Sequence, residues 1–213
     1  LHVAGLTREL PICKVNDHMD IAAFIMFGDV ELTVACARDL LAKCPDFDII
    51  LTAEAKGIPL AYEMARQSGK PWLTARKGVK LYMSEPVVIE DESITTAGKQ
   101  KLVIDKKDID AMNGKRILIV DDVISTGGSL IETVEALREA GAEVLGAVSI
   151  FTYGMEKGKQ RLAEAKVRAV SLTDFDEIVA VAEAEGYIPA HTVPGLMAFR
   201  ANPSDESWMG GKK

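Results

Sequence analysis

Four short apolar runs alternate with segments of helical periodicity along this chain, and that alternation limits the fold more than any other feature. Each run is brief, rich in aliphatic or β-branched side chains, and bounded by charged or turn-forming residues, which predicts buried strands. Strands that alternate with helices form a parallel twisted sheet covered by helices on both faces, so the sequence predicts an α/β fold. The predicted strands span residues 47–52, 71–75, 116–120 and 143–151, with a further strand at 167–172; the predicted helices span residues 31–43, 58–67, 129–140, 156–165 and 176–185.

Composition indicates a globular protein that needs no metal or disulfide to hold its core. Of the 213 residues, 48% are hydrophobic and 27% are charged. A chain of this length buries about 70% of its unfolded surface on folding. Glycine and proline are dispersed and no segment repeats, so we expect a single domain over residues 1–213.

The charge balance limits the partners of the protein. Lys and Arg number 25, Asp and Glu number 32, and the net charge is −7, which disfavours a general nucleic-acid or membrane-surface binder. The first residues do not resemble a signal peptide, and no apolar run is long enough to span a membrane. Three widely spaced cysteines match no metal or redox motif. We therefore expect a cytoplasmic protein. Because its net charge is negative, a phosphate site must be formed by a small local group of residues.

The segment at 81–108 interrupts the strand and helix rhythm. Its alternating stretches at 93–97 and 101–105 predict a two-stranded excursion from the sheet. Long insertions of this kind are often functional. Three cations lie at its start and have no evident acidic partner in the sequence, which favours a lid over a passive connector: Arg76, Lys77 and Lys80.

Residues 117–130, ILIVDDVISTGGSL, carry the strongest chemical signal. A buried strand delivers Asp121 and Asp122 to the sheet edge, where adjacent side chains of an extended chain point to opposite sides. The small loop that follows can bring hydroxyls and backbone N–H groups to a phosphate at a helix N-terminus. Its donors are Ser125, Thr126, Gly127, Gly128 and Ser129.

A purely structural interpretation makes this segment a strand-to-helix turn, with Ser129 as the N-cap and Glu132 as its capping-box partner. Capping leaves the two acids and the paired glycines unexplained. Walker-type and dinucleotide-binding loops are excluded because neither glycine pattern occurs after a strand.

Three motifs together resemble the type I phosphoribosyltransferases, which use phosphoribosyl pyrophosphate (PRPP). Segment 117–130 is similar to their PRPP-binding motif, residues 54–58 (EAKGI) resemble their pyrophosphate loop, and residues 76–81 (RKGVKL) resemble the start of their flexible loop. The resemblance covers about residues 30 to 150, in the family's order and spacing. It implies the family's Rossmann-like sheet, with a small hood over residues 1–30 and a flexible β-hairpin loop over residues 76–108.

The same resemblance implies the reaction. The 5-phosphoribosyl group of PRPP would pass to a nucleobase, giving a nucleoside 5′-monophosphate and pyrophosphate, with Mg²⁺ as cofactor. Asp121 and Asp122 would hold the ribose hydroxyls, and Mg²⁺ would bind mainly through PRPP, with a possible contact to either acid. Residues 125–129 would bind the 5′-phosphate, and Lys56, Gly57 and Arg76 would bind the diphosphate. Lys77 and Lys80 would neutralise the charge of the leaving group as the loop closes and excludes water.

The base is expected to be a purine, with adenine ahead of xanthine or guanine, because the middle of the chain resembles that branch. Thr96 departs from this pattern, since adenine enzymes place a glutamate there. The tail from 149 onward resembles orotate phosphoribosyltransferases, yet Tyr82 stands where those enzymes carry a histidine. Orotate remains the alternative. The candidate base contacts are Phe24, Phe27, Thr96 and Tyr153, although an aromatic in an apolar run more often belongs to a core.

Two other classes compete with an enzyme. A response-regulator receiver domain also has a strand ending in two acids, but the later strands here lack the required Asp and Lys. A non-catalytic PRPP-binding regulator needs a DNA-binding module, for which the chain leaves little room. The enzyme is expected to be a homodimer, because a second subunit supplies a wall that keeps water from the reacting centre.

Overall fold

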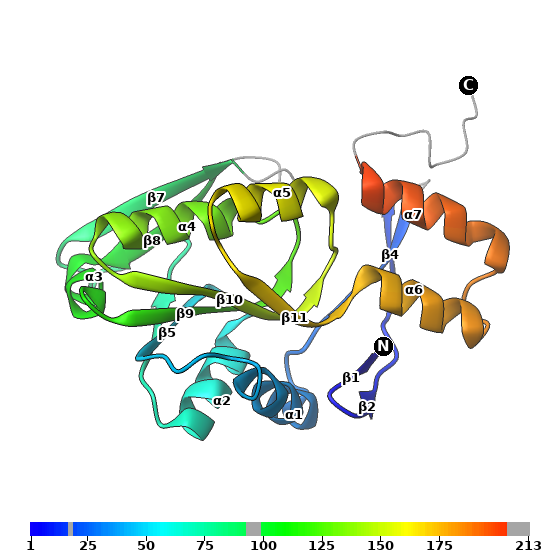
Figure 1. The fold of residues 1–213 in the computed structure, drawn as a ribbon, viewed down its shortest axis with the longest axis horizontal. Helices are drawn as coiled ribbons and strands as arrows, with labels where there is room; N and C mark the ends of the chain where they lie inside the picture. Colours follow the sequence, from blue (N-terminus) through cyan, green and yellow to red (C-terminus); the bar gives the residue numbers. More distant parts are fainter. Residues whose placement is uncertain (17–18, 93–98, 204–213) are drawn as a thin grey trace.

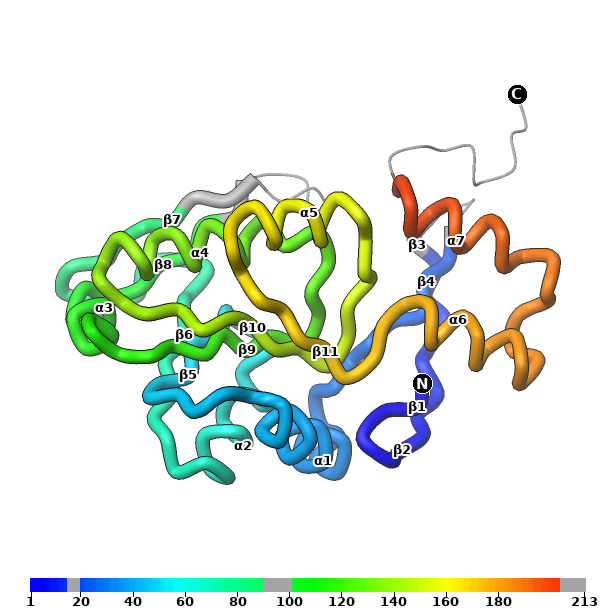
Figure 2. The backbone as a smooth tube through the Cα atoms, in the orientation of Figure 1, coloured from blue at the N-terminus to red at the C-terminus, as the bar shows by residue number. Residues whose placement is uncertain are grey.

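The computed structural model describes residues 1–16, 19–92 and 99–203. Its centre is a five-stranded parallel sheet in the order β11-β10-β9-β5-β6. Figure 1 labels the strands from β11 to β5, and Figure 2 also labels β6. The predicted parallel α/β fold is confirmed. The five strands are β5 (Ile49–Ala53), β6 (Trp72–Ala75), β9 (Arg116–Ile124), β10 (Glu143–Thr152) and β11 (Ala169–Asp174).

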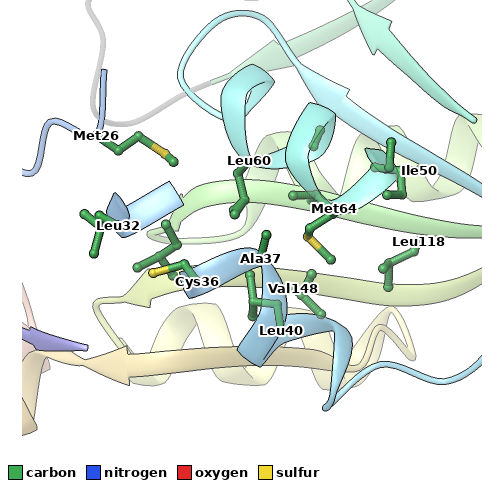
Figure 3. Packing of buried hydrophobic residues seen from close by; sticks show 14 of the residues in the cluster. Met26, Leu32, Cys36, Ala37, Leu40, Ile50, Leu60, Met64, Leu118 and Val148 are labelled. Atoms are coloured by element: carbon green, nitrogen blue, oxygen red, sulfur yellow. The ribbon is translucent and has the colours of Figure 1, made fainter. Parts of the chain in front are cut away.

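Helices cover both faces of the sheet because successive strand residues point to opposite sides. Leu118 and Val120 of β9 face the cluster that includes residues of α1 and α2, whereas Ile117 and Ile119 face the cluster that includes residues of α4. Figure 3 shows the first of these clusters, with Met64 of α2 lying over the strands. The helices are α1 (Val30–Leu41), α2 (Ile58–Ser68), α4 (Gly128–Glu139) and α5 (Glu156–Glu164), close to their predicted bounds.

Strand β9 is longer than its predicted range of 116–120. It runs on to Ile124 because β10 continues beside it, pairing Asp121 with Ser149 and Ile124 with Thr152. Both acids therefore lie within a strand, where neighbouring backbones fix their directions.

The expected two-stranded excursion is present, with its first strand displaced. Antiparallel strands β7 (Pro86–Glu92) and β8 (Lys99–Asp105) pair along seven positions. The predicted second strand, 101–105, falls within β8, but the first strand precedes the predicted range of 93–97, which lies outside the described residues. The β-branched residues Val87, Val88 and Ile89 favour the observed strand, and the hairpin ends in an unpredicted short helix, α3 (Lys106–Met112).

The chain ends contribute small elements beside the sheet (Figure 2). The imidazole of His2 lies 3.0 Å from the carboxylate of Glu185, which joins the N-terminal segment to the end of α6. None of the helices within the described ranges is long and apolar enough to cross a membrane. These elements are β1 (His2–Val3), β2 (Leu6–Thr7), β3 (Ile12–Asn16), β4 (Met19–Ala22), α6 (Phe175–Ala184), the 3-10 helix Ala190–Thr192 and α7 (Val193–Ala201).

Candidate active site

The turn between β9 and α4 forms an open helix N-terminus. Gly127 is the N-cap, with a φ of 73° that glycine adopts without strain, and it provides no side-chain cap. Helix α4 begins at Gly128, so Ser129 lies inside the helix and the capping-box interpretation of Ser129 and Glu132 is wrong. The first N–H groups of α4 are therefore not occupied by a capping side chain.

A cavity of about 190 Å³ opens at this turn. It lies at the carboxyl ends of β5 and β9, where parallel sheets bind ligands. Asp121 also borders it, so the structure brings one predicted acid and the predicted phosphate loop around a common space. The lining includes Thr52, Ala53, Ser125, Thr126, Gly127, Gly128 and Ser129.

The two acids of β9 have different surroundings. Asp121 borders the cavity, and its Oδ1 accepts a hydrogen bond of 2.9 Å from the backbone N–H of Asp122. The Asp122 side chain is buried, and its carboxyl group lies close enough to that of Asp121 for the two side chains to share a hydrogen bond. Burial, together with the neighbouring Asp122 carboxylate, raises the pKa of Asp121 well above its usual range, an effect that the charge of Lys56 partly offsets. The cavity thus holds a carboxyl group that a bound cation or hydroxyl would stabilise.

The predicted pyrophosphate loop lies directly against Asp121. It connects β5 to α2 and contains a cis peptide bond between Glu54 and Ala55. Gly57 is buried, and a Cβ atom there would collide with the Thr52 hydroxyl and approach Asp121. The loop therefore needs glycine for space, since its φ of −71° is ordinary. Lys56 is exposed beside the loop, within electrostatic range of Asp121.

Glu54 pairs with the cations at the start of the insertion. Its carboxylate lies 3.5 Å from Arg76 Nη1 and 3.7 Å from Lys80 Nζ. It also accepts a hydrogen bond of 2.9 Å from the backbone N–H of Lys77. The expectation that the cations lack an acidic partner is wrong for Arg76 and Lys80, because β5 and β6 are adjacent parallel strands and the residues that follow them meet at one edge.

Of the candidate base contacts that the structure describes, none borders the cavity. Phe24 is half-buried against the core beside α1 and Phe27 is exposed, while Thr96 lies outside the described residues. Tyr153 follows β10, stacks on Phe175 with ring centroids 6.0 Å apart, and has its pKa raised by burial. Tyr153 is thus part of an aromatic cluster next to the carboxyl edge of the sheet.

Helix α5 supports the phosphate loop, a role that the sequence analysis missed. A Cβ on Gly158 would lie 3.1 Å from the carbonyl oxygen of Ser125, and a Cβ on Gly127 would lie 3.3 Å from Leu162. A glycine in the first turn of a predicted helix was the available signal, because a glycine inside a helix often has a packing reason.

The residues near the cavity suit a metal that is held mostly by its substrate. Within the described ranges, no group of three or more His, Cys, Asp or Glu side chains could hold a metal ion. Asp121 and Asp122 are the adjacent carboxylates, and Mg²⁺ commonly combines one or two such ligands with phosphate oxygens and water.

Comparison with known proteins agrees with this geometry. The family model for the phosphoribosyl transferase domain matches residues 32–185. The orotate phosphoribosyltransferase of Halalkalibacterium halodurans is 36% identical over 165 residues, which are 78% of this chain and 70% of that protein. That of Bacillus cytotoxicus is 52% identical over 99 residues, 46% of this chain and 47% of its own, so the chain spans about half the length of this relative.

Solved structures share the fold. The adenine phosphoribosyltransferase of Thermoanaerobacter pseudethanolicus superposes with a TM-score of 0.63 at 22% identity, over 78% of this chain and 96% of that one. That of Leishmania donovani gives a TM-score of 0.64 at 20% identity, over 78% and 75%. With a family model that covers most of the chain and a sheet that matches these structures, this protein belongs to the phosphoribosyltransferase family.

Proposed function

We propose that this protein transfers the 5-phosphoribosyl group of PRPP to a nucleobase and releases pyrophosphate. The observation that carries the proposal is the cavity in which Asp121 faces an uncapped helix N-terminus rich in hydroxyls. A sugar phosphate needs both features, since backbone N–H groups bind the phosphate and a carboxylate accepts hydrogen bonds from the sugar hydroxyls.

Each part of PRPP has an assigned place in this proposal. The 5′-phosphate binds the loop of residues 125–129, and the ribose hydroxyls bind Asp121, which borders the cavity, and Asp122, whose carboxyl group is next to it. The diphosphate binds Lys56 and the backbone at Gly57, and Arg76, Lys77 and Lys80 neutralise the charge that develops as it leaves. Mg²⁺, when bound with PRPP, would supply further positive charge to the leaving diphosphate.

Carboxylates next to the ribose favour a transition state with positive charge on the sugar. Exclusion of water protects that cation from hydrolysis. In this proposal the hairpin of β7 and β8 supplies part of the cover, since Leu102 of β8 borders the cavity.

For the base we propose a purine, with adenine ahead of xanthine or guanine. The motifs of residues 54–58 and 76–81 support this choice. Beside Tyr153, the guanidinium of Arg200 donates to the carbonyl of Gly154 and lies 2.9 Å from Asp176. A cation that is already paired suits a neutral base better than the anionic orotate, which would need a free positive charge.

Orotate is the second candidate, because the Halalkalibacterium relative named above is an orotate phosphoribosyltransferase. The Tyr153 cluster lies in the tail that resembles orotate phosphoribosyltransferases in sequence. To bind an anionic base, Arg200 would have to break its ion pair with Asp176.

A panel of bases tests the proposal directly. Adenine, guanine, hypoxanthine, xanthine, orotate and uracil are each incubated with PRPP and Mg²⁺, and pyrophosphate release is measured. Release with adenine supports the purine assignment, and release with orotate alone replaces it. PRPP binding without release from any base would contradict an enzyme and favour a PRPP-binding regulator. The Asp121→Asn variant controls for contaminating activity.

A further inference from the structure

The carboxylate of Glu54 occupies an unexpected place for an anion. It belongs to the loop proposed to bind a diphosphate, yet it faces Arg76, the Lys77 backbone and Lys80 at once. The Glu54 side chain is only 23% exposed, so its contacts are screened less than those of a fully exposed pair.

Glu54 is ionised in the free protein. The hydrogen bond from Lys77 N–H, followed by the charges of Lys80 and Arg76, keeps the pKa of Glu54 below its usual range. The charged side chains of Arg76 and Lys80 are also proposed to neutralise the departing diphosphate. An incoming anion must therefore compete with Glu54 for these donors, or lie beside a like charge.

We propose that Glu54 is a positioning residue that acts as a built-in counter-ion, holding the cationic start of the insertion at the pyrophosphate loop until a diphosphate takes over its partners. This inference rests on the proposed function for the identity of the anion. Its geometric basis is independent, since two loops 22 residues apart in sequence are joined by this carboxylate.

Two consequences follow from the exchange of partners. Without ligand, Glu54 restrains the segment 76–83, so removal of its charge should loosen that segment. With ligand, Glu54 is a competing anion, so removal of its charge should strengthen the binding of a diphosphate. A residue that only supported the fold would give the first effect together with weaker binding.

Hydrogen exchange of the ligand-free protein tests the first consequence. In Glu54→Gln, amides of residues 76–83 should exchange at least about threefold faster than in the wild type, because an ion-pair network that limits local opening is lost. The matched control is Asp110→Asn, which removes a carboxylate from the Lys106 pair on α3. Unchanged exchange at 76–83 in Glu54→Gln would overturn the proposal.

Titration calorimetry with inorganic pyrophosphate, with and without Mg²⁺, tests the second consequence. The dissociation constant should fall at least about threefold in Glu54→Gln, with the gain shrinking at high salt because charge repulsion is screened. Glu54→Asp keeps the negative charge but has a shorter side chain. It should therefore loosen residues 76–83 without strengthening the binding of pyrophosphate. Weaker pyrophosphate binding in Glu54→Gln would mean a structural role and contradict the proposal.

Steady-state kinetics distinguish failure of the counter-ion proposal from failure of the proposed function. If the protein is an enzyme, Glu54→Gln should lower the KM for PRPP and also lower kcat where release of pyrophosphate is slow. Failure of every base to react, with the exchange and calorimetric effects intact, would refute the proposed function alone. Normal catalysis with neither effect would refute the counter-ion alone.

Discussion

Gly57 and Asp121 come so close that a Cβ atom on Gly57 would lie 3.3 Å from both Cα and Oδ1 of Asp121. The contact joins the loop after β5 to the acid on β9, and it brings the proposed diphosphate site next to the proposed ribose site. The same Cβ atom would collide with the Thr52 hydroxyl, so this position has no room for a side chain unless the loop or one of these groups moves.

Gly57→Ala should therefore impair catalysis more than folding. We expect kcat/KM to fall at least about tenfold, or about 1.4 kcal/mol of transition-state stabilisation, because the new methyl group displaces either the loop or Asp121. Steady-state kinetics and thermal unfolding measure the two effects. Gly78→Ala is the control, since a Cβ there meets no atom within 4 Å. Equal activities in the two variants would show that the Gly57 contact is unimportant.

Asp121→Asn should lose activity and gain stability. We expect kcat/KM to fall at least about tenfold, as we do for Asp122→Asn. The pKa of Asp121 is raised in the folded state, whereas its unfolded value is about 3.9. Between these two pKa values the folded state binds more protons than the unfolded state. The free energy of unfolding therefore falls as pH rises from the unfolded to the folded pKa. The asparagine variant should lack this fall.

Urea denaturation of the wild type and Asp121→Asn across the acid and neutral range measures the difference. Parallel pH profiles would contradict the raised pKa. Wild-type kinetics in both asparagine variants would remove the ribose assignment.

Arg116 should stabilise the fold at neutral pH, and this stability should be lost in acid. Its guanidinium contacts Asp48 and Asp46 at 2.8 Å each, and it holds the pKa of Asp48 well below its usual range. A lowered folded pKa gives stability above the unfolded pKa that is lost as pH falls. Arg116→Met should therefore lower the Tm at neutral pH and flatten its acid dependence.

Calorimetry across the acid range checks this second pH dependence, with Arg38→Met as the control because Arg38 pairs with its neighbour Asp39 on the same helix. If the Tm of Arg116→Met depends on acid pH in the same way as that of the wild type, the acid sensitivity arises from other groups.

The protein is expected to be active as a homodimer. Three large apolar side chains around the start of α1 are more than half exposed, namely Ile25 (55%), Phe27 (51%) and Val30 (72%). A second copy would cover such a patch. Sedimentation equilibrium at assay concentration should give twice the monomer mass of 23.0 kDa.

Val30→Asp should dissociate the dimer, whereas Tyr187→Ser, at another exposed site, should not. A fully active species at the monomer mass would rule out the requirement for a dimer.

The sequence alone determined the parallel sheet, most helix bounds and the loop of residues 125–129 beside Asp121. These features depend on local periodicity, on short buried runs and on the small residues after β9, all of which are readable along the chain. The same local signals located the loop of residues 54–58 and the cationic start of the insertion as separate motifs.

Tertiary structure decided how these motifs meet. The first strand of the hairpin lies at Pro86–Glu92 because pairing with β8 selects its position, and the strand β9 extends to Ile124 because β10 does. The contacts of Glu54 with Arg76 and Lys80, and of Gly57 with Asp121, form only when neighbouring parallel strands bring their ends to one edge. Such contacts depend on the order of strands in space, which local sequence patterns do not encode.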